Sequence, residues 1–185
     1  KFKKLRKKLY VIAIEPNHFL LDEPVYKLVD QTLCIGFNQI DSPDLSIKKL
    51  FYPKNDKSEQ GATILKNYTH QECFRENDYF HIICGNPSRI IKELNTLENL
   101  KSKKIILRIN CEGLEDDVIY SLHNHFKKNL VLVLGSLKDV LEIKGKTSYE
   151  NLINFMEKQN IKFQPFNDGI RDWPKAHAEI LQLIS

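Results

Sequence analysis

The chain has 185 residues, of which 42% are apolar, and this fits one globular domain with a sizeable core. Its formal charge is +4, but residues 1–8 hold six of the 28 basic residues and no acid, so the other 22 basic and 24 acidic residues leave the body at −2. We therefore expect no nucleic-acid-binding face, and no apolar run approaches the ~18 residues that would span a bilayer.

The first predicted elements are separated by turns. Residues 9–14 form a continuous apolar run that stops at Glu15-Pro16-Asn17, which predicts a buried strand followed by a turn. Helical spacing predicts a short helix over residues 23–32. Further strands are predicted at residues 33–40, 49–52 and 79–86. The polar tract at residues 53–61 is predicted to be a mobile loop.

The second half alternates strands and helices more regularly. Apolar runs rich in β-branched residues predict strands, at residues 103–110, 130–135 and 161–166. Apolar positions three and four residues apart predict helices, at residues 89–97, 113–126, 148–159 and 174–184. Strands that alternate with helices predict an α/β fold with a mostly parallel sheet and helices on both faces.

The cysteines indicate the redox environment. They are widely spaced, without a C-x-x-C pair, at Cys34, Cys73, Cys84 and Cys111. Three of them lie in or beside apolar runs, where a free cysteine acts as a small hydrophobe. This favours a reduced, cytoplasmic protein over a disulfide scaffold. The six histidines show no ligand spacing relative to these cysteines, so we expect no metal site.

Candidate functional residues follow the predicted strands, because ligands of parallel sheets bind outside the carboxyl ends of the strands. They are Glu15-Pro16-Asn17, Gly85-Asn86-Pro87 and residues 110–115. An acid such as Glu15 at a strand end can accept hydrogen bonds from two adjacent ribose hydroxyls. The alternative is a solvated acid in a turn, where Pro16 ends the strand.

Four carboxylates crowd into residues 112–117. Glu115, Asp116 and Asp117 fit the first turn of a helix, where each stabilises the helix dipole by ~0.3–1 kcal/mol. Glu112 lies before that turn and could serve as general base, metal ligand or substrate anchor. The acids are therefore interpreted as a mixture of helix-start residues and candidate site residues.

Other polar segments give weaker indications. His123 and His125 lie near the end of a predicted helix, where cationic side chains are favoured in any case. Residues 135–148 are interpreted as a loop-like connection. They do not form a phosphate-binding loop, because Gly135 and Gly145 lack the required spacing.

Two segments together resemble the FkbM-type family of S-adenosylmethionine-dependent methyltransferases. They are YVIAIEPN (residues 10–17) and KKIILRINCEGLEDDVI (residues 103–119). Members of that family pair a strand ending in Glu-Pro-Asn with a later strand reading roughly Lys-Ile-Asp-x-Glu-Gly-x-Glu. The similarity covers residues 9 to about 125 in order.

The resemblance implies a Rossmann-like fold, S-adenosylmethionine as cofactor, and methyl transfer to a hydroxyl of a sugar, glycan or other small metabolite. It implies that Glu15 binds the cofactor ribose, and Asn86 is placed near it. Asn110 and Glu112 are expected on the acceptor side, as catalytic residues, whereas Glu115 is expected to be a helix-start acid. The sulfonium is already electrophilic, so alignment of the hydroxyl and a nearby base accounts for most of the rate.

The chain departs from the family in two ways. Asn110 stands where the family has an aspartate, and asparagine cannot take a proton. The family's first strand and its loop, Asp-x-Gly-x-Asn-x-Gly, are not found, and the chain opens on a run with helical spacing, KFKKLRKKL. We therefore expect one methyltransferase-like domain over residues 1–185, truncated at its N-terminus and lacking that strand and loop.

Two other functions stay open at this point. The first is a catalytically degenerate relative with a structural or interaction role, which the substitution at Asn110 and the missing loop favour. The second is a glycosyltransferase-type domain of the doubly wound class, which would bind a sugar nucleotide with the help of a metal ion.

Overall fold

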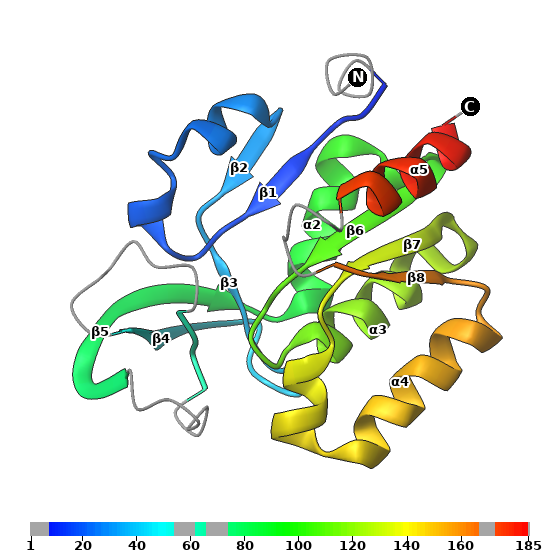
Figure 1. Ribbon diagram of the computed structural model, residues 1–185. Coiled ribbons are helices and arrows are strands. Elements are labelled where there is room, and N and C mark those ends of the chain that lie inside the picture. Colours follow the sequence, from blue (N-terminus) through cyan, green and yellow to red (C-terminus); the bar gives the residue numbers. More distant parts are fainter. Residues whose placement is uncertain (1–7, 54–61, 66–73, 167–172, 185) are drawn as a thin grey trace. The chain divides into compact units, whose positions relative to one another are not determined.

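Strands and helices alternate along most of the computed structural model (Figure 1), a mixed α/β protein whose sheets are mostly parallel. The structure describes residues 8–53, 62–65, 74–166 and 173–184, with the backbone alone for 74–77. Two compact units are present, the first in residues 1–38 and 43–85 and the second in residues 39–42 and 86–185. The single domain expected over the whole chain stays a prediction.

The first unit begins with a two-stranded parallel sheet of β1 (Ile12–Ile14) and β2 (Gln31–Leu33). The helix predicted over residues 23–32 is found only in part, as a short 3₁₀ helix over Pro24–Leu28 with Pro24 in its first turn, and β2 begins at Gln31. Val25 in this 3₁₀ helix is 60% exposed. A short helix that buries none of its residues has little to stabilise it, and the chain becomes extended after it.

A second sheet completes the first unit, in the order β3 (Gly36–Phe37), β5 (Phe74–Gly85), β4 (Leu45–Pro53). β3 runs parallel to β5, and β4 runs antiparallel to it. The strands predicted at residues 49–52 and 79–86 are therefore segments of one long antiparallel pair, β4 and β5. Alternate side chains of this pair form an apolar cluster around Leu50, Ile82 and Cys84.

The strand predicted at residues 33–40 is divided between two sheets. Leu33 ends β2, and Gly36–Phe37 pair with β5. A Cβ atom on Gly36 would lie 2.7 Å from Cys84 Sγ and 3.3 Å from Pro16 Cβ. Glycine is needed here because the chain passes closely between its neighbours as it leaves one sheet and joins the other. Most of the loop predicted at residues 53–61 lies outside the described residues.

The second unit follows the sequence prediction closely. Its sheet is entirely parallel, in the order β6 (Ile105–Ile109), β7 (Leu130–Gly135), β8 (Lys162–Pro165). The predicted helices are confirmed with small shifts of their ends, as α2 (Pro87–Glu98), α3 (Glu115–Phe126), α4 (Lys146–Lys158) and α5 (Trp173–Ile184). Short connecting helices are found at Leu100–Ser102 and Lys127–Asn129, and a π-helix at Val140–Lys144. In the first unit a further short helix is found at His18–Leu20.

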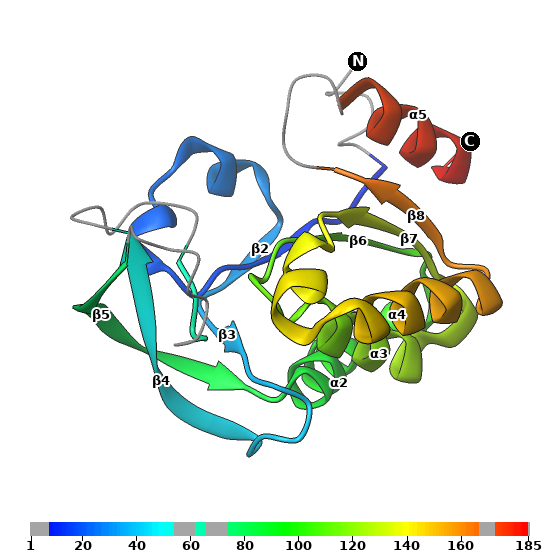
Figure 2. The same cartoon turned by 60° about the horizontal axis from the view of Figure 1, so that its bottom comes forward.

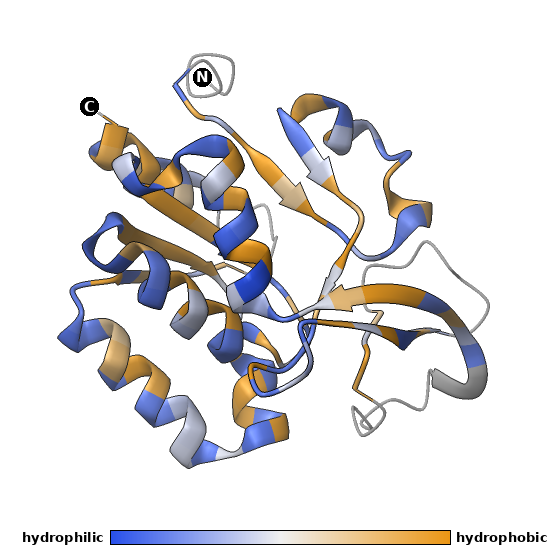
Figure 3. Cartoon of the chain, turned by 180° about the vertical axis from the view of Figure 1, so that it is seen from behind, coloured by the Kyte–Doolittle hydropathy of each residue, from blue (hydrophilic) through white to orange (hydrophobic). Residues whose placement is uncertain are grey.

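Helices cover both faces of this sheet, as predicted. Leu132 and Leu134 of β7 pack against Ala176 of α5 on one face. Val133 points to the other face, where α3 contributes the fully buried Ile119. Figure 2 shows α5 on one side of the sheet and α3 with α4 on the other, and Figure 3 shows the apolar strands between helices of mixed hydropathy. Each fully buried aliphatic side chain contributes roughly 1.5–3 kcal/mol.

Two further observations bear on the expected environment of the protein. No described helix combines the length and apolar content needed to cross a membrane. Cys34, Cys84 and Cys111 carry free thiols, and Cys73 lies outside the described residues. The cytoplasmic location stays a prediction.

Candidate functional site at the carboxyl edge of the parallel sheet

The loop after β6 is held close to the end of β7. A Cβ atom on Gly135, the last residue of β7, would lie 2.4 Å from the carbonyl oxygen of Ile109, the last residue of β6. Residues 110–114 then connect β6 to α3, with φ angles of 49° at Glu112 and 102° at Gly113. A tight left-handed turn therefore follows β6 directly, at the edge where parallel sheets bind ligands.

Glu115 fixes the shape of this loop. It is fully buried, and its Oε1 accepts a hydrogen bond from the backbone N–H of Cys111 (2.7 Å) while Oε2 accepts one from Gly113 (3.0 Å). Burial raises the pKa of Glu115 to about 7, against the lowering effect of these backbone bonds, and the charge of Asp139 also raises it. Glu115 starts α3, as predicted, but its carboxylate points back to the loop. We infer that it is a positioning residue.

Asn110 and Glu112, both predicted for the acceptor side, are in contact. The Asn110 Nδ2 donates a hydrogen bond to Glu112 Oε1 over 3.1 Å. Asn110 is exposed and Glu112 is half-buried. The pair therefore lies at the surface, on a loop that Glu115 holds rigidly, and the amide orients the Glu112 carboxylate. Their role in catalysis stays a prediction.

Asp116 and Asp117, the other helix-start acids, share one lysine. Lys144 Nζ lies 2.5 Å from Asp116 Oδ1 and 3.1 Å from Asp117 Oδ2, and the three side chains are largely buried. Burial lowers the pKa of Lys144, but the hydrogen bonds and charges of the two aspartates outweigh it and raise that pKa. Burial also raises the pKa of Asp117, and the charge of Asp116 raises it further, against the lowering effect of Lys144. The two short contacts indicate that Lys144 neutralises both carboxylates.

The sequence interpretation missed Lys144. Residues 135–148 were expected to be a loop-like connection, but they contain the π-helix Val140–Lys144 and the buried Asp139. Lys144 is 27 residues from Asp117 along the chain. No local pattern indicates such a pairing, because only the tertiary structure brings the two residues together.

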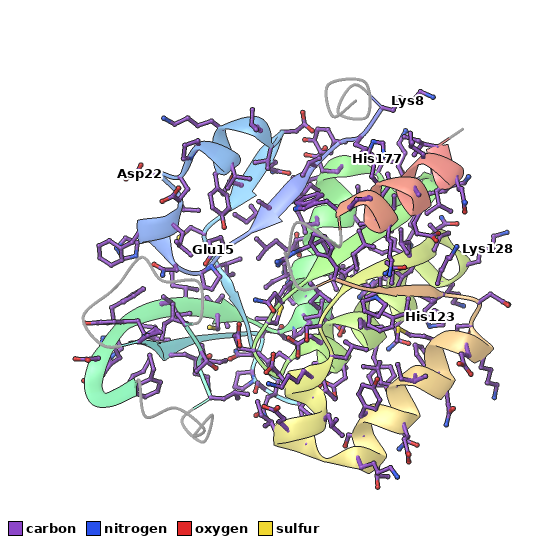
Figure 4. The ribbon with its side chains drawn as sticks, viewed as in Figure 1. Lys8, Glu15, Asp22, His123, Lys128 and His177 are labelled. Atoms are coloured by element: carbon purple, nitrogen blue, oxygen red, sulfur yellow. The ribbon has the colours of Figure 1, made fainter. Side chains whose placement is uncertain are left out.

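Glu15 follows β1 in the first unit, as predicted, and is labelled in Figure 4. Its Oε1 accepts a hydrogen bond from the backbone N–H of Asn17 (2.8 Å), and its Oε2 accepts one from the hydroxyl of Tyr26 (2.9 Å). The side chain of the buried Asn17 in turn accepts a bond from the N–H of Phe19. The carboxylate therefore has a fixed orientation at the end of a parallel strand. Its role in binding ribose stays a prediction.

Asn86 has a structural role at the start of α2. Its Oδ1 accepts a hydrogen bond from the backbone N–H of Ser88 (3.0 Å), which caps the helix. Its Nδ2 donates to the carbonyl oxygens of Ile40 (2.6 Å) and Ser42 (3.2 Å). These bonds tie residues 39–42 to the second unit, and a role in cofactor binding stays a prediction.

Replacing Asn86 with aspartate separates the two structural roles. Asn86→Asp keeps the acceptor for Ser88 but removes the donor to Ile40 and Ser42 and places a charge against their carbonyl oxygens. We expect the free energy of unfolding, measured by urea denaturation, to fall by about 2 kcal/mol, because a buried acceptor left unsatisfied costs about 1–3 kcal/mol. The matched control is Asn95→Asp, which keeps the acceptor for the N–H of Lys101. Equal losses in the two variants would contradict the assignment.

The predicted site residues are divided between the two units. Asn86, Asn110 and Glu112 belong to the second unit, and Glu15 belongs to the first. Within the described ranges, no group of three or more His, Cys, Asp or Glu side chains is placed to hold a metal ion. No family model, curated protein or solved structure matches the chain. The function is therefore inferred from the residues and their contacts.

Proposed function

We propose that this chain forms a Rossmann-like, FkbM-type methyltransferase domain that uses S-adenosylmethionine to methylate a hydroxyl on a sugar or other small metabolite. The observation that supports it best is the pairing of the parallel strands. A doubly wound sheet has the strand order 3-2-1-4-5-6. Without strand 1, two parallel groups remain, 3-2 and 4-5-6. β2–β1 and β6–β7–β8 pair in the same two groups.

The connections are consistent with this scheme. α2 precedes β6, α3 joins β6 to β7, and α4 joins β7 to β8, as βαβ units with parallel strands require. Among the described strands, none pairs with the second edge of β1 or of β6. The β3–β5–β4 sheet is then an insertion between the third and fourth strands.

In this proposal Glu15 binds the ribose of the cofactor. A carboxylate accepts hydrogen bonds from two adjacent hydroxyls, and Asn17 and Tyr26 hold this one in a fixed orientation. S-adenosylmethionine, when bound, supplies the electrophilic methyl group. The described residues thus fit the ribose, whereas the hydrogen bonds of Asn86 are directed into its own unit, so we leave Asn86 out of the cofactor site.

Glu112 acts on the acceptor side. Its carboxylate accepts the proton of the acceptor hydroxyl, and the amide of Asn110 keeps the carboxylate oriented. Glu115 contributes indirectly, because it holds the backbone at Cys111 and Gly113. A rigid loop aligns the hydroxyl before the reaction, and this alignment supplies much of the rate.

One observation favours a non-catalytic relative as the second candidate. An amide occupies position 110, and its side chain donates to Glu112. At positions 110 and 112 the loop therefore presents only the carboxylate of Glu112, whereas the family that the chain resembles also has an aspartate at the position of Asn110. In that case the same hydrogen bonds would serve only to hold the fold, and the cofactor would not bind.

Calorimetric titration of S-adenosylmethionine into the full-length gene product tests the proposal. We expect saturable binding, and we expect Glu15→Gln to raise the Kd about 10- to 100-fold, because hydrogen bonds to a charged acceptor contribute about 1.5–3 kcal/mol. Glu23→Gln is the matched control, since Glu23 is an exposed acid of the same unit whose side chain forms no capping bond.

The outcomes separate the two candidates. Weaker binding by the Glu15 variant, with binding by the Glu23 variant unchanged, supports the ribose site. If the full-length protein binds no S-adenosylmethionine at millimolar concentration, the methyltransferase proposal fails and the non-catalytic relative is favoured. Urea denaturation of each variant verifies that a change in Kd does not come from unfolding.

A further inference from the structure

A basic hollow lies at the amino edge of the β6–β7–β8 sheet, at the other end of the strands from Asn110 and Glu112. Its volume is about 620 Å³. The end of α3, the turn before β7, the end of α4 and the turn before β6 contribute to it. We define the basic hollow by its lining residues, Lys101, His123, His125, Phe126, Lys127, Lys128, Asn129, Lys158, Gln159 and Asn160.

The side chains that line the basic hollow give it a strongly positive charge. Four lysines and two histidines line it, and no aspartate or glutamate does. All four lysines are exposed, and none of them forms a salt bridge with another residue in the part of the chain that the structure describes. Because the chain outside residues 1–8 has slightly more acids than bases, this concentration of unneutralised lysines departs from the overall balance.

Helix dipoles explain only part of this arrangement. Cations are favoured at helix C-termini, which accounts for Lys127 after α3 and Lys158 at the end of α4. That effect acts within the last turn of each helix separately. It does not explain why Lys101, from the short helix Leu100–Ser102, and Lys128, from the short helix Lys127–Asn129, line the same concave space.

The backbone of the hollow is held in unusual conformations. Lys127 has a φ of 45° and a ψ of −123°, and Asn160 has a φ of 56°. A lysine with such angles costs free energy that the surrounding structure must offset, and residues of this kind cluster at functional sites.

The ring of His123 packs edge-on against Phe155 with centroids 5.0 Å apart, which fixes its position at the wall of the basic hollow. Figure 4 labels His123 and Lys128.

We propose that the basic hollow binds a small molecule that carries a diphosphate group. Lysine ammonium groups and side-chain amides are hydrogen-bond donors that suit phosphoryl oxygens, and charge-assisted bonds of this type are the stronger ones. A single phosphate would fill little of the volume, which lies within the range of small-molecule sites. Four lysines around one space match several negative charges better than one. The site does not depend on the proposed methyltransferase function.

The experiment is calorimetric titration of inorganic pyrophosphate into the full-length protein at fixed ionic strength. We expect saturable binding with one ligand per chain. Lys128→Ala combined with Lys158→Ala should weaken it about 10-fold or more. Orthophosphate should bind at least about 10-fold more weakly than pyrophosphate.

The matched control is Lys138→Ala combined with Lys146→Ala. These lysines belong to the same unit, lie outside the basic hollow, and have side chains that are 71% and 80% exposed. The control removes the same charge, so we expect the Kd for pyrophosphate to change less than about twofold. In NMR spectra, the ring signals of His123 and His125 should shift as pyrophosphate is added.

Three results would overturn the proposal. The first is the absence of saturable pyrophosphate binding at millimolar concentration. The second is equal weakening in the two double variants, which would mean attraction by overall charge alone. The third is equal affinity for orthophosphate and pyrophosphate. Urea denaturation of both double variants verifies that each is folded during the titration.

Discussion

Lys144→Met is expected to lower the free energy of unfolding by about 2–4 kcal/mol at pH 7. Methionine keeps an unbranched apolar side chain of similar length but removes the charge that neutralises Asp116 and Asp117. Both carboxylates have side chains that are only 12% exposed, so they would be left as buried charges without a cation. Urea denaturation followed by circular dichroism measures the change.

Lys138→Met is the control for this experiment. Lys138 is six residues away in the same segment, and it pairs with Glu142 one helical turn along, but its side chain is 71% exposed. Exposed pairs of this kind contribute little because water screens them. We therefore expect a much smaller change for Lys138→Met than for Lys144→Met. Similar losses in both variants would show that Lys144 does not act through the buried aspartates.

Stability is expected to decrease between pH 5 and pH 8 because of Glu115. Burial raises the pKa of this carboxyl from 4.5 to about 7, so the folded protein holds the proton more tightly than the unfolded chain. The stabilising contribution is complete below pH 4.5 and is lost as the pH rises through 7. From pH 5 to pH 8 the group should remove roughly 2–3 kcal/mol from the free energy of unfolding.

Glu115→Gln removes this titration, because the side-chain amide of glutamine does not ionise in this range. Urea denaturation of the wild-type protein and the variant at pH 5, 6, 7 and 8 gives the difference between their stabilities, in which the titrations of other groups cancel. As the pH rises from 5 to 8, we expect the variant to gain stability relative to the wild-type protein. Glu157→Gln, at an exposed position of α4, is the matched control for replacing a glutamate with glutamine. Parallel curves for wild type and Glu115→Gln would exclude the raised pKa.

The sequence predicted the second unit well because its signals are local. Apolar residues at helical spacing and runs of β-branched residues mark α2 to α5 and β6 to β8, and each pattern fits within one element. The predicted starts of α2 and α3, at residues 89 and 113, lie within two residues of the observed starts at Pro87 and Glu115. In this unit the local preferences agree with the tertiary packing.

The first unit was predicted less well, because its structure depends on pairing between distant residues. The long antiparallel pair of β4 and β5 places Ile47 opposite Ile83, and neither strand alone indicates that partner. The helix expected over residues 23–32 had suitable spacing, but the 3₁₀ helix that forms there buries none of its residues. Spacing alone therefore does not decide an element when contacts from elsewhere in the chain are required.

The candidate site shows the same division. The contact between Asn110 and Glu112 could be expected, because the two residues lie on either side of one cysteine in a tight turn. The capping role of Asn86 also has a local signature, an asparagine directly before a proline at a helix start. The link from Lys144 to Asp116 could not be predicted, since it joins the ends of two different βα connections.

The π-helix that carries Lys144 affects how this region can change in evolution. A π-turn corresponds to an α-helix with one inserted residue. Deleting a single residue from Val140–Lys144 would restore α-helical spacing and rotate Lys144 by about 100° around the helix axis, away from Asp116 and Asp117. The ion pair therefore depends on the length of the segment as much as on the lysine itself. Homologous chains that keep both aspartates should keep this length even where every other residue of the segment has been replaced.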